Sequence, residues 1–136
     1  MKKILFITTI ILSLTFCSTW DTRLVLVNNT QNRISYDFDI MDIKDTLPSL
    51  EYCKESKPYY INSMSEKRIQ SQNNFDGLKN PQDPPEEILR IFIIEEDTLT
   101  KYGFCTVYKN PKLYKRIDLT YDDMVKANWR VVYNGK

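Results

Sequence analysis

The sequence predicts one mainly β domain of the α+β class over residues 23–134. We expect a mostly antiparallel two-layer sheet or a β-sandwich with one or two short helices. Two patterns support this fold class. Residues 33–40 alternate between apolar and polar side chains, which is typical of a strand with one buried face. Residues 23–28 and 88–95 carry apolar side chains on both parities, as in strands that are covered on both sides.

The first two strands are predicted on either side of an asparagine-rich turn. Residues 23–28 are interpreted as a central strand. Residues 28–32 then favour a hairpin, because asparagine tolerates left-handed backbone and bonds its own main chain. In the strand 33–40, one face is expected to join the core and the other to be solvated. The core face carries Ile34, Tyr36, Phe38 and Ile40, and the solvated face carries Arg33, Ser35, Asp37 and Asp39.

Two polar segments, residues 41–57 and 72–87, are predicted to be long surface loops. The second contains three of the six prolines in the chain, which argues against regular structure there. Between the two loops, the short segment 59–61 is expected to pair with residues 66–71 as a hairpin.

The apolar run 88–95 is predicted to form the core strand of the domain. Arg90 is its only charged residue before the end of the run. Asp97 or Thr98 is then expected to cap a short helix that continues to about Tyr108, although a glycine within it lowers the helix propensity.

The last third of the chain predicts a strand, a helix and a final strand. A strand over residues 113–119 is followed by Thr120–Asp123, which resembles a capping box. The final strand is expected over residues 129–133. Only nine residues separate Leu119 from Trp129, which is short for a parallel crossover, so we expect the helix to turn a corner between antiparallel strands.

The N-terminus resembles a bacterial lipoprotein signal. Two lysines precede the apolar run 4–16, which is shorter than the roughly 20 residues of a membrane-spanning helix. Cys17 follows, at the position that takes a diacylglycerol thioether in lipoproteins, although Phe16 stands where a small residue is usual. We therefore expect residues 1–17 to be a signal that ends at a lipidated Cys17. Ordinary cleavage near Thr15 or Cys17 is the alternative.

Residues 18–22 are predicted to form a short tether between the lipid anchor and the domain. Trp20 on this tether is expected either to dock on the domain or to lie at the lipid headgroups, where indole rings are favoured. The predicted location is the cell envelope, on the periplasmic or outer-surface side of a membrane, and the lipid bilayer is the first expected partner.

Composition disfavours several classes of function. Two of the 19 basic residues lie in the signal, so 17 remain against 18 acidic residues, and this balance supplies no field to attract nucleic acid. The chain has no histidine, the most common general base and a common metal ligand. Its three glycines form no phosphate-binding loop. We therefore expect no nucleic-acid partner, no cofactor, no metal and no catalytic residue.

Cys53 and Cys105 remain after Cys17, and a disulfide between them would persist outside the cytoplasm. The alternative is two buried thiols, since cysteine is also a small apolar residue that packs well. The sequence leaves both possibilities open.

Carboxylates offer two further hypotheses. The density of Asp37, Asp39, Asp42 and Asp45 would suit calcium, but their spacing matches no EF-hand loop and a solvated strand face is favoured. Residues 95–97 or 122–123 could supply the two carboxylates of a glycosidase, yet adjacent acids are more typical of helix caps and strand ends. A small carboxylate-based hydrolase is therefore the third functional hypothesis.

Aromatic residues suggest where a partner would bind. Most of the nine tyrosines fit half-buried strand positions, but Tyr52, Tyr59 and Tyr60 are the best exposed candidates for stacking on sugars. A glycan-binding accessory protein is therefore the alternative function. On the two long loops, Tyr52 and Phe75 are the preferred partner-binding residues, because packing periodicity explains them least. The competing interpretation is that they seal the core beneath the loops.

Several motifs in the mature chain support a family resemblance. They are the strand–Asn28-Asn29–strand opening, Asp45-Thr46-Leu47-Pro48, Ile91-Phe92-Ile93, Asp97-Thr98-Leu99, Tyr114-Lys115-Arg116, Asp118-Leu119-Thr120 and Asn128-Trp129. On these motifs the chain resembles small lipoproteins of unknown function known from Bacteroidota. The resemblance implies structural positions and supplies no catalytic residue. We expect a membrane-anchored lipoprotein outside the cytoplasm, acting as a non-catalytic binding or envelope-assembly module on a protein or glycan partner.

The disulfide hypothesis has a direct test. If Cys53 and Cys105 are bridged, intact-mass measurement gives the exported protein about two mass units below its reduced form, because forming the bond removes two hydrogens. Alkylation of two thiols in the folded, unreduced protein would rule the bridge out.

Overall fold

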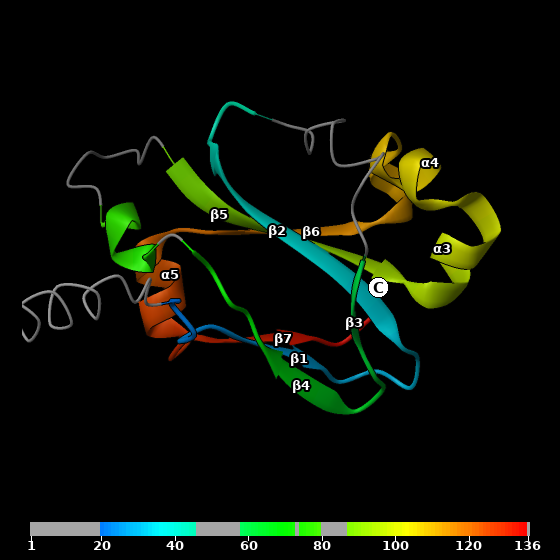
Figure 1. Cartoon of the computed structure of the whole chain (residues 1–136), viewed down its shortest axis with the longest axis horizontal. Coiled ribbons are helices and arrows are strands. Elements are labelled where there is room, and N and C mark those ends of the chain that lie inside the picture. Colours follow the sequence, from blue (N-terminus) through cyan, green and yellow to red (C-terminus); the bar gives the residue numbers. More distant parts are fainter. Residues whose placement is uncertain (1–19, 46–57, 73, 80–86, 136) are drawn as a thin grey trace, which may run out of the picture.

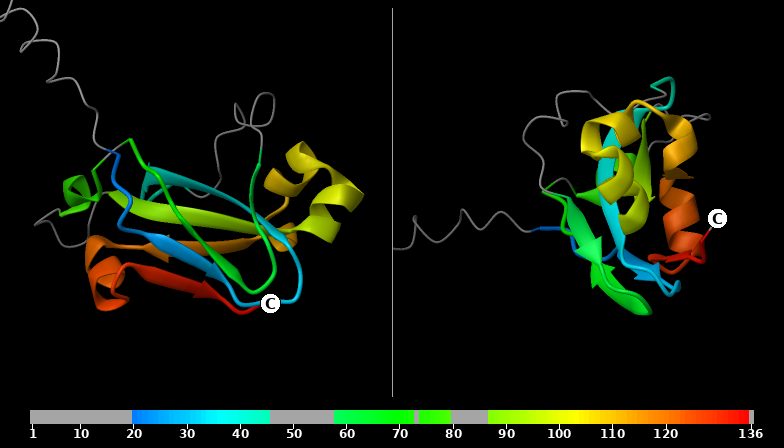
Figure 2. Two further views of the ribbon diagram at one scale, coloured as in Figure 1. Left: turned by 60° about the horizontal axis from the view of Figure 1, so that its bottom comes forward. Right: turned by 90° about the vertical axis from the view of Figure 1, so that its right-hand side faces the viewer.

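The structure is a computed structural model that describes residues 20–45, 58–72, 74–79 and 87–135. In this part of the chain, two sheets pack face to face with short helices at their ends, which confirms the predicted mainly β two-layer class (Figures 1 and 2). The strands are β1 (Val25–Asn28), β2 (Ile34–Asp42), β3 (Tyr59–Ile61), β4 (Ser65–Arg68), β5 (Glu87–Glu95), β6 (Lys115–Leu119) and β7 (Arg130–Tyr133). The helices are α3 (Glu96–Tyr102), α4 (Phe104–Tyr108) and α5 (Tyr121–Lys126), with 3₁₀ turns η1 (Phe75–Leu78) and η2 (Pro111–Leu113).

The larger sheet has the strand order β3-β2-β5-β6, and all its pairs are antiparallel. Its centre is the pair of β2 with β5, which runs in register from Ile34 opposite Glu95 to Asp42 opposite Glu87. The predicted core strand is confirmed, because every residue of β5 from Ile88 to Ile94 is buried. A strand that is buried on both faces needs cover on both. The smaller sheet covers one face of β5, and the helices α3 and α4 cover part of the other.

The smaller sheet has the order β4-β1-β7, so β1 is the central strand that the sequence predicts. The main core lies between this sheet and the larger one. Leu24 and Leu26 from the β1 side meet Leu89, Ile91 and Ile93 from β5 in this core. Met124 of α5 and Phe75 of η1 close the core at one end.

Two predicted hairpins are wrong, because the chain changes layer at both turns. β1 and β2 belong to different sheets, and so do β3 and β4. β4 and β7 already occupy both edges of β1, so β2 cannot bond to it and crosses to the opposite layer. Local turn signals indicate where the chain bends, but they do not say which layer the next strand joins.

Asn28 joins these two crossovers. Its side chain is 0% exposed, and its Nδ2 donates to the carbonyl oxygens of Asn32 (2.8 Å), Ile61 (3.3 Å) and Asn62 (2.9 Å). Its Oδ1 accepts from both the backbone N–H and the hydroxyl of Thr30, at 3.2 and 2.7 Å. One side chain therefore bonds the β1–β2 crossover and the β3–β4 crossover together, and every polar atom of the buried amide has a partner.

The expected solvated face of β2 is partly covered, which corrects a second prediction. Ser35 is buried, and Asp37 is half-buried and accepts a bond from the Tyr108 hydroxyl (3.1 Å). Opposite them on β5, Phe92 and Ile94 lie in contact with α4 residues including Val107 and Tyr108. The helices α3 and α4 form this second, smaller apolar cluster, which periodicity within β2 alone does not reveal.

The predicted helix of residues 97–108 is interrupted. α3 and α4 are separated at Gly103, whose φ of 75° is a backbone conformation that only glycine adopts readily. The capping box at Thr120 is present in full, because its hydroxyl accepts from the Asp123 N–H while the Asp123 carboxylate accepts from the Thr120 backbone.

The last strand departs from the antiparallel expectation. α5 turns a corner after β6, but it carries the chain into the other layer, where β7 pairs with β1 in parallel, Val25 opposite Arg130. The short connection of nine residues does not prevent this pairing, because β6 and β7 belong to different sheets and no crossover within one sheet is needed.

The role of Asn28 can be tested with an isosteric change. Asn28→Asp keeps the shape but replaces the donor amide by a carboxylate that faces three carbonyl oxygens. We expect the free energy of unfolding at pH 7 to fall by about 3 kcal/mol, measured by urea denaturation, because a buried carboxylate oxygen that faces three carbonyl oxygens and no donor is costly, although Thr30 still donates to the other oxygen.

Asn29→Asp is the matched control. Asn29 is exposed and bonds only the exposed side chain of Asn134 (2.8 Å) among the side chains described, so its change is expected to stay within about 0.5 kcal/mol. Equal losses for the two variants would contradict a special role for Asn28.

Candidate functional site

A groove opens along one side of the sandwich, between the edge strands β3 and β4 of the two layers. Its volume is about 230 Å³, and we call it the aromatic groove. The groove is lined by Trp20, Tyr36, Phe38, Tyr59, Lys67, Arg68 and Gln70. It exists because β3 and β4 are short and lie in different sheets, so their edges face each other without bonding.

Two tyrosines form part of the groove wall. Tyr36 on β2 and Tyr59 on β3 are register partners, and their ring centroids are 5.5 Å apart at an angle of 30°. Tyr36 is buried, and this burial raises the pKa of its hydroxyl to about 12, so the hydroxyl stays protonated at neutral pH. Tyr59 is 53% exposed and presents its ring to solvent. The wall therefore combines a fixed inner ring with an accessible outer ring.

Two cations line the opposite wall on β4. Lys67 has its Nζ 5.7 Å from the Tyr59 ring centroid, and Arg68 donates weakly to the Thr22 carbonyl oxygen (3.5 Å). Among the described residues, neither forms an ion pair with a carboxylate. Lys67 lies opposite Leu26 on an edge strand, where a charged side chain discourages the pairing of a further strand. This role on the edge strand needs no counterion, and the Lys67 ammonium has none among the described residues that line the groove.

The edge of β2 above the groove is already bonded. β3 covers only Ile34–Tyr36 of β2. Beyond it, the backbone N–H groups of Phe38 and Ile40 donate to the carboxylates of Asp37 and Asp39, each at 2.9 Å. These N–H groups are therefore not available to an added strand, and the groove is not a site for strand addition.

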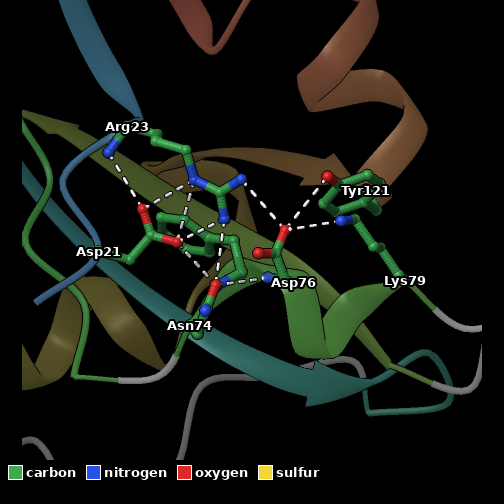
Figure 3. A network of polar contacts seen from close by, with 7 residues as sticks. Asp21, Arg23, Asn74, Asp76, Lys79 and Tyr121 are labelled. Atoms are coloured by element: carbon green, nitrogen blue, oxygen red, sulfur yellow. Dashed lines mark hydrogen bonds and ion pairs between the residues drawn. The ribbon is translucent and has the colours of Figure 1, made fainter. Parts of the chain in front are cut away.

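A polar network, the Arg23 network, fixes the chain beside the groove (Figure 3). It consists of Asp21, Arg23, Asn74, Asp76, Lys79 and Tyr121. The Arg23 guanidinium bonds the Asp21 carboxylate through Nη2 at 2.7 Å and Nε at 3.1 Å, and it reaches Asp76 at 3.1 Å. The guanidinium carbon also lies 4.1 Å from the centre of the Trp129 ring.

The network ties three distant segments together. Asp21 also accepts from the Phe75 backbone N–H (3.0 Å), and Asp76 accepts from the Tyr121 hydroxyl (3.2 Å) and pairs with Lys79 (3.1 Å). Hydrogen bonds from Arg23 hold the pKa of Asp21 below its ordinary value, and the bond from Lys79 is the main cause that lowers the pKa of Asp76. Both carboxylates are therefore ionised and occupied at neutral pH, which suits a structural clamp.

The Arg23 network also helps to determine where the chain becomes fixed to the domain. An isolated backbone bridge between Asp21 and Ser71 adds two hydrogen bonds of 2.9 and 3.0 Å, so the chain is fixed to the domain from Asp21 onward. Trp20 stands just before this point, 48% exposed, at the rim of the aromatic groove. Within the ranges that the structure describes, no helix is long and apolar enough to cross a membrane.

The predicted site residues have different outcomes. Phe75 is 0% exposed and packs against Trp129, with ring centroids 5.9 Å apart, so it seals the core and is not an exposed binding residue. Cys105 lies half-buried on α4. Cys17, Tyr52 and Cys53 lie outside the described residues.

The acidic clusters serve local structure. Glu96 pairs with Arg33, Glu95 accepts from the Tyr133 hydroxyl at 3.3 Å, and Asp123 belongs to the capping box. Asp42 bonds the Lys44 backbone N–H (2.8 Å). Among the described residues, no group of three His, Cys, Asp or Glu side chains is placed to hold a metal ion.

Sequence reasoning missed the two cations of the groove and the position of Trp20 beside them. Lys67 and Arg68 stand in a segment that was predicted to pair with residues 59–61, and that pairing would hide the groove. Tyr59 was identified as exposed, and its 53% exposure agrees. The available signal was the polar and charged composition of residues 65–68, Ser-Glu-Lys-Arg, which is typical of an exposed edge strand.

The Arg23 network yields a prediction with a definite pH dependence. Because Arg23 is partly exposed, we expect Arg23→Gln to lower the free energy of unfolding by only about 1 kcal/mol at pH 7. The native pKa of Asp21 lies below its ordinary value of 3.8, so its stabilisation is present above that pH and is lost as the pH falls through the native pKa. The difference between variant and wild type should therefore shrink below about pH 4, as followed by urea denaturation at several pH values.

Arg130→Gln provides the comparison. Arg130 pairs with Glu66 at 2.6 Å, but both side chains are about half exposed, so little loss is expected at any pH. If the loss of unfolding free energy in Arg23→Gln stays constant down to pH 2, the ion pair of Arg23 with the Asp21 carboxylate does not contribute to stability.

No protein-family model, no curated protein and no solved structure matches this chain. The resemblance to Bacteroidota lipoproteins therefore stays a prediction from the sequence motifs.

Proposed function

We propose that this chain is an exported lipoprotein, anchored at Cys17 on the outer side of a membrane, that acts as a non-catalytic binding module of the cell envelope. The basic and apolar N-terminal segment followed by Cys17 supports export and lipidation. The motif resemblance to small Bacteroidota lipoproteins is consistent with this role.

The observation that carries the proposal is the position of the groove relative to the anchor. The chain is fixed to the domain from Asp21, and Trp20 lines the aromatic groove. Cys17 is three positions before Trp20, so the anchor and the groove are separated by a very short length of chain. A binding surface so close to its anchor acts at the membrane.

The chemistry of the groove supports binding over catalysis. Its described lining is aromatic, cationic and amide and contains no carboxylate. Asp37, next to the lining residue Phe38, has a pKa raised by burial, but its carboxylate accepts bonds from the Phe38 N–H and the Tyr108 hydroxyl, and Asp21 and Asp76 of the Arg23 network are held in ion pairs. A general acid or base needs a carboxylate that can exchange a proton with a substrate near the working pH. Carboxylates whose pKa values are lowered by cations are poor candidates for that task.

A second candidate is a glycan-binding accessory protein, and the groove rings favour it. Tyr59 is exposed beside the ring of Tyr36, at an angle of 30°, and exposed aromatic rings are the kind of surface on which sugars stack. The volume of about 230 Å³ would admit a single small sugar ring. This candidate shares the anchor and differs in the ligand.

The anchor is tested by changing the cysteine. Intact-mass analysis of the native protein is expected to show diacylglycerol and a further acyl chain on Cys17, because several chains together give firm anchoring where one does not. Cys17→Ser should lose these masses and move the protein from the membrane to the soluble envelope fraction. A native N-terminus downstream of Cys17 without lipid would refute the proposal, and Cys105→Ser, which leaves the anchor intact, is the control.

A further inference from the structure

We propose that the face around the aromatic groove docks on the anionic phospholipid headgroups of the membrane that holds the anchor. The partner is thus the headgroup surface itself, and the contact is made by Trp20, Tyr59, Lys67 and Arg68. This inference rests on the proposed anchoring at Cys17.

The first step is the reach of the tether. A fully extended chain spans at most about 3.6 Å per residue, so Trp20 stays within about 11 Å of Cys17. One headgroup layer is about 6 Å thick, and the screening length at physiological salt is about 8 Å. The Trp20 side of the domain therefore cannot leave the zone in which headgroup charges act.

The second step is that the domain presents this side without rearranging. Asp21 is bonded to Ser71 and Arg23, so the chain leaves the domain beside the groove in a fixed direction. Trp20 is both the first described residue of the chain and a groove-lining residue. The surface nearest to the anchor is consequently the groove rim.

The third step is the chemistry of that rim. Trp20 and Tyr59 are 48% and 53% exposed, and amphipathic aromatic rings are favoured at the level of the headgroups. Lys67 and Arg68 form no ion pair with the carboxylates of the described residues, so their charges are open to phosphate groups. Exposed rings beside unpaired cations, with no carboxylate in the described lining, complement an anionic interface.

Two observations favour a surface over an enclosed ligand. The groove volume of about 230 Å³ is below the range of about 300–1,000 Å³ that is usual for small-molecule pockets. The bonded edge of β2 also excludes an added peptide strand, because the N–H groups of Phe38 and Ile40 are occupied. A flat, extended partner such as a lipid surface needs neither a deep pocket nor a free strand edge.

The chain has two tryptophans, which makes the contact measurable. The native lipoprotein is reconstituted in vesicles of phosphatidylglycerol and phosphatidylcholine that include phospholipids brominated on the acyl chains. We expect bromine to quench the wild-type fluorescence and to leave Trp20→Phe, which retains only the partly buried Trp129, nearly unquenched. Equal quenching of the two proteins, or none in the wild type, overturns the proposal.

The charges are tested in the same vesicles with the double variant Lys67→Gln/Arg68→Gln. Its Trp20 quenching should fall clearly, whereas Lys101→Gln/Lys109→Gln, two exposed lysines on α3 and after α4 at the far end of the molecule, should behave like wild type (Figure 1). If the two double variants behave alike, the cations of the groove do not hold the domain on the membrane.

Binding without the lipid separates docking from anchoring. Each cation near an anionic surface is worth a factor of about five in binding, so sedimentation of Cys17→Ser protein with phosphatidylglycerol vesicles should weaken about 30-fold when Lys67→Gln and Arg68→Gln are added. Vesicles of phosphatidylcholine alone should bind much less. No dependence on lipid charge overturns the proposal.

The outcomes also separate this inference from the proposed function. Lipid on Cys17 without quenching of Trp20 would leave the anchor standing and refute docking. An unlipidated native protein that still binds anionic vesicles through Lys67 and Arg68 would support docking and refute the anchor. If acidic oligosaccharides shift the Trp20 emission and anionic vesicles do not, the ligand of the groove is a glycan and the proposed docking on lipid is refuted.

Discussion

The arrangement of the two layers depends on the buried amide of Asn28. It lies at the end of the central strand β1, where the chain leaves one layer, and it bonds the carbonyl groups of the second crossover at Ile61 and Asn62. Each crossover breaks a sheet ladder and leaves main-chain groups near the core without strand partners. A single side chain with two donor hydrogens and an acceptor satisfies several of them at once, so both crossovers are held in one place.

The open side of the sandwich follows from these crossovers. Because the chain changes layer at Asn28–Arg33 and again at Asn62–Met64, the short strands β3 and β4 end up on facing edges of different sheets. Their edges do not bond, and the space between them is the aromatic groove. The Arg23 network then fixes the start of the described chain next to this groove, which places Trp20 at its rim.

The position of the groove residues is related to the proposed lipid anchor. A lipid anchor restricts where a domain can be, and a short tether also restricts which face it shows to the membrane. Trp20, Tyr59 and the cations of β4 line one groove, while α3 and α4 lie at the other end of the molecule from the point where the described chain begins (Figure 2). Groups that interact with headgroups are thus concentrated where the covalent anchor would bring them.

The sequence by itself determined the fold class, the central strand β1, the core strand β5 and the capping box at Thr120. Each of these depends on neighbours within about ten residues: alternation, apolar runs and cap chemistry are local properties. The N-terminal signal and the exposure of Tyr59 were also predicted from local pattern.

Only the tertiary structure decided the rest. These are the layer that β2 and β4 join, the parallel pairing of β7, the burial of Phe75 and the presence of Trp20 and Lys67 in one groove. All of them depend on contacts between distant segments, because strands compete for partner edges and for a shared core, and no local pattern records the outcome of that competition.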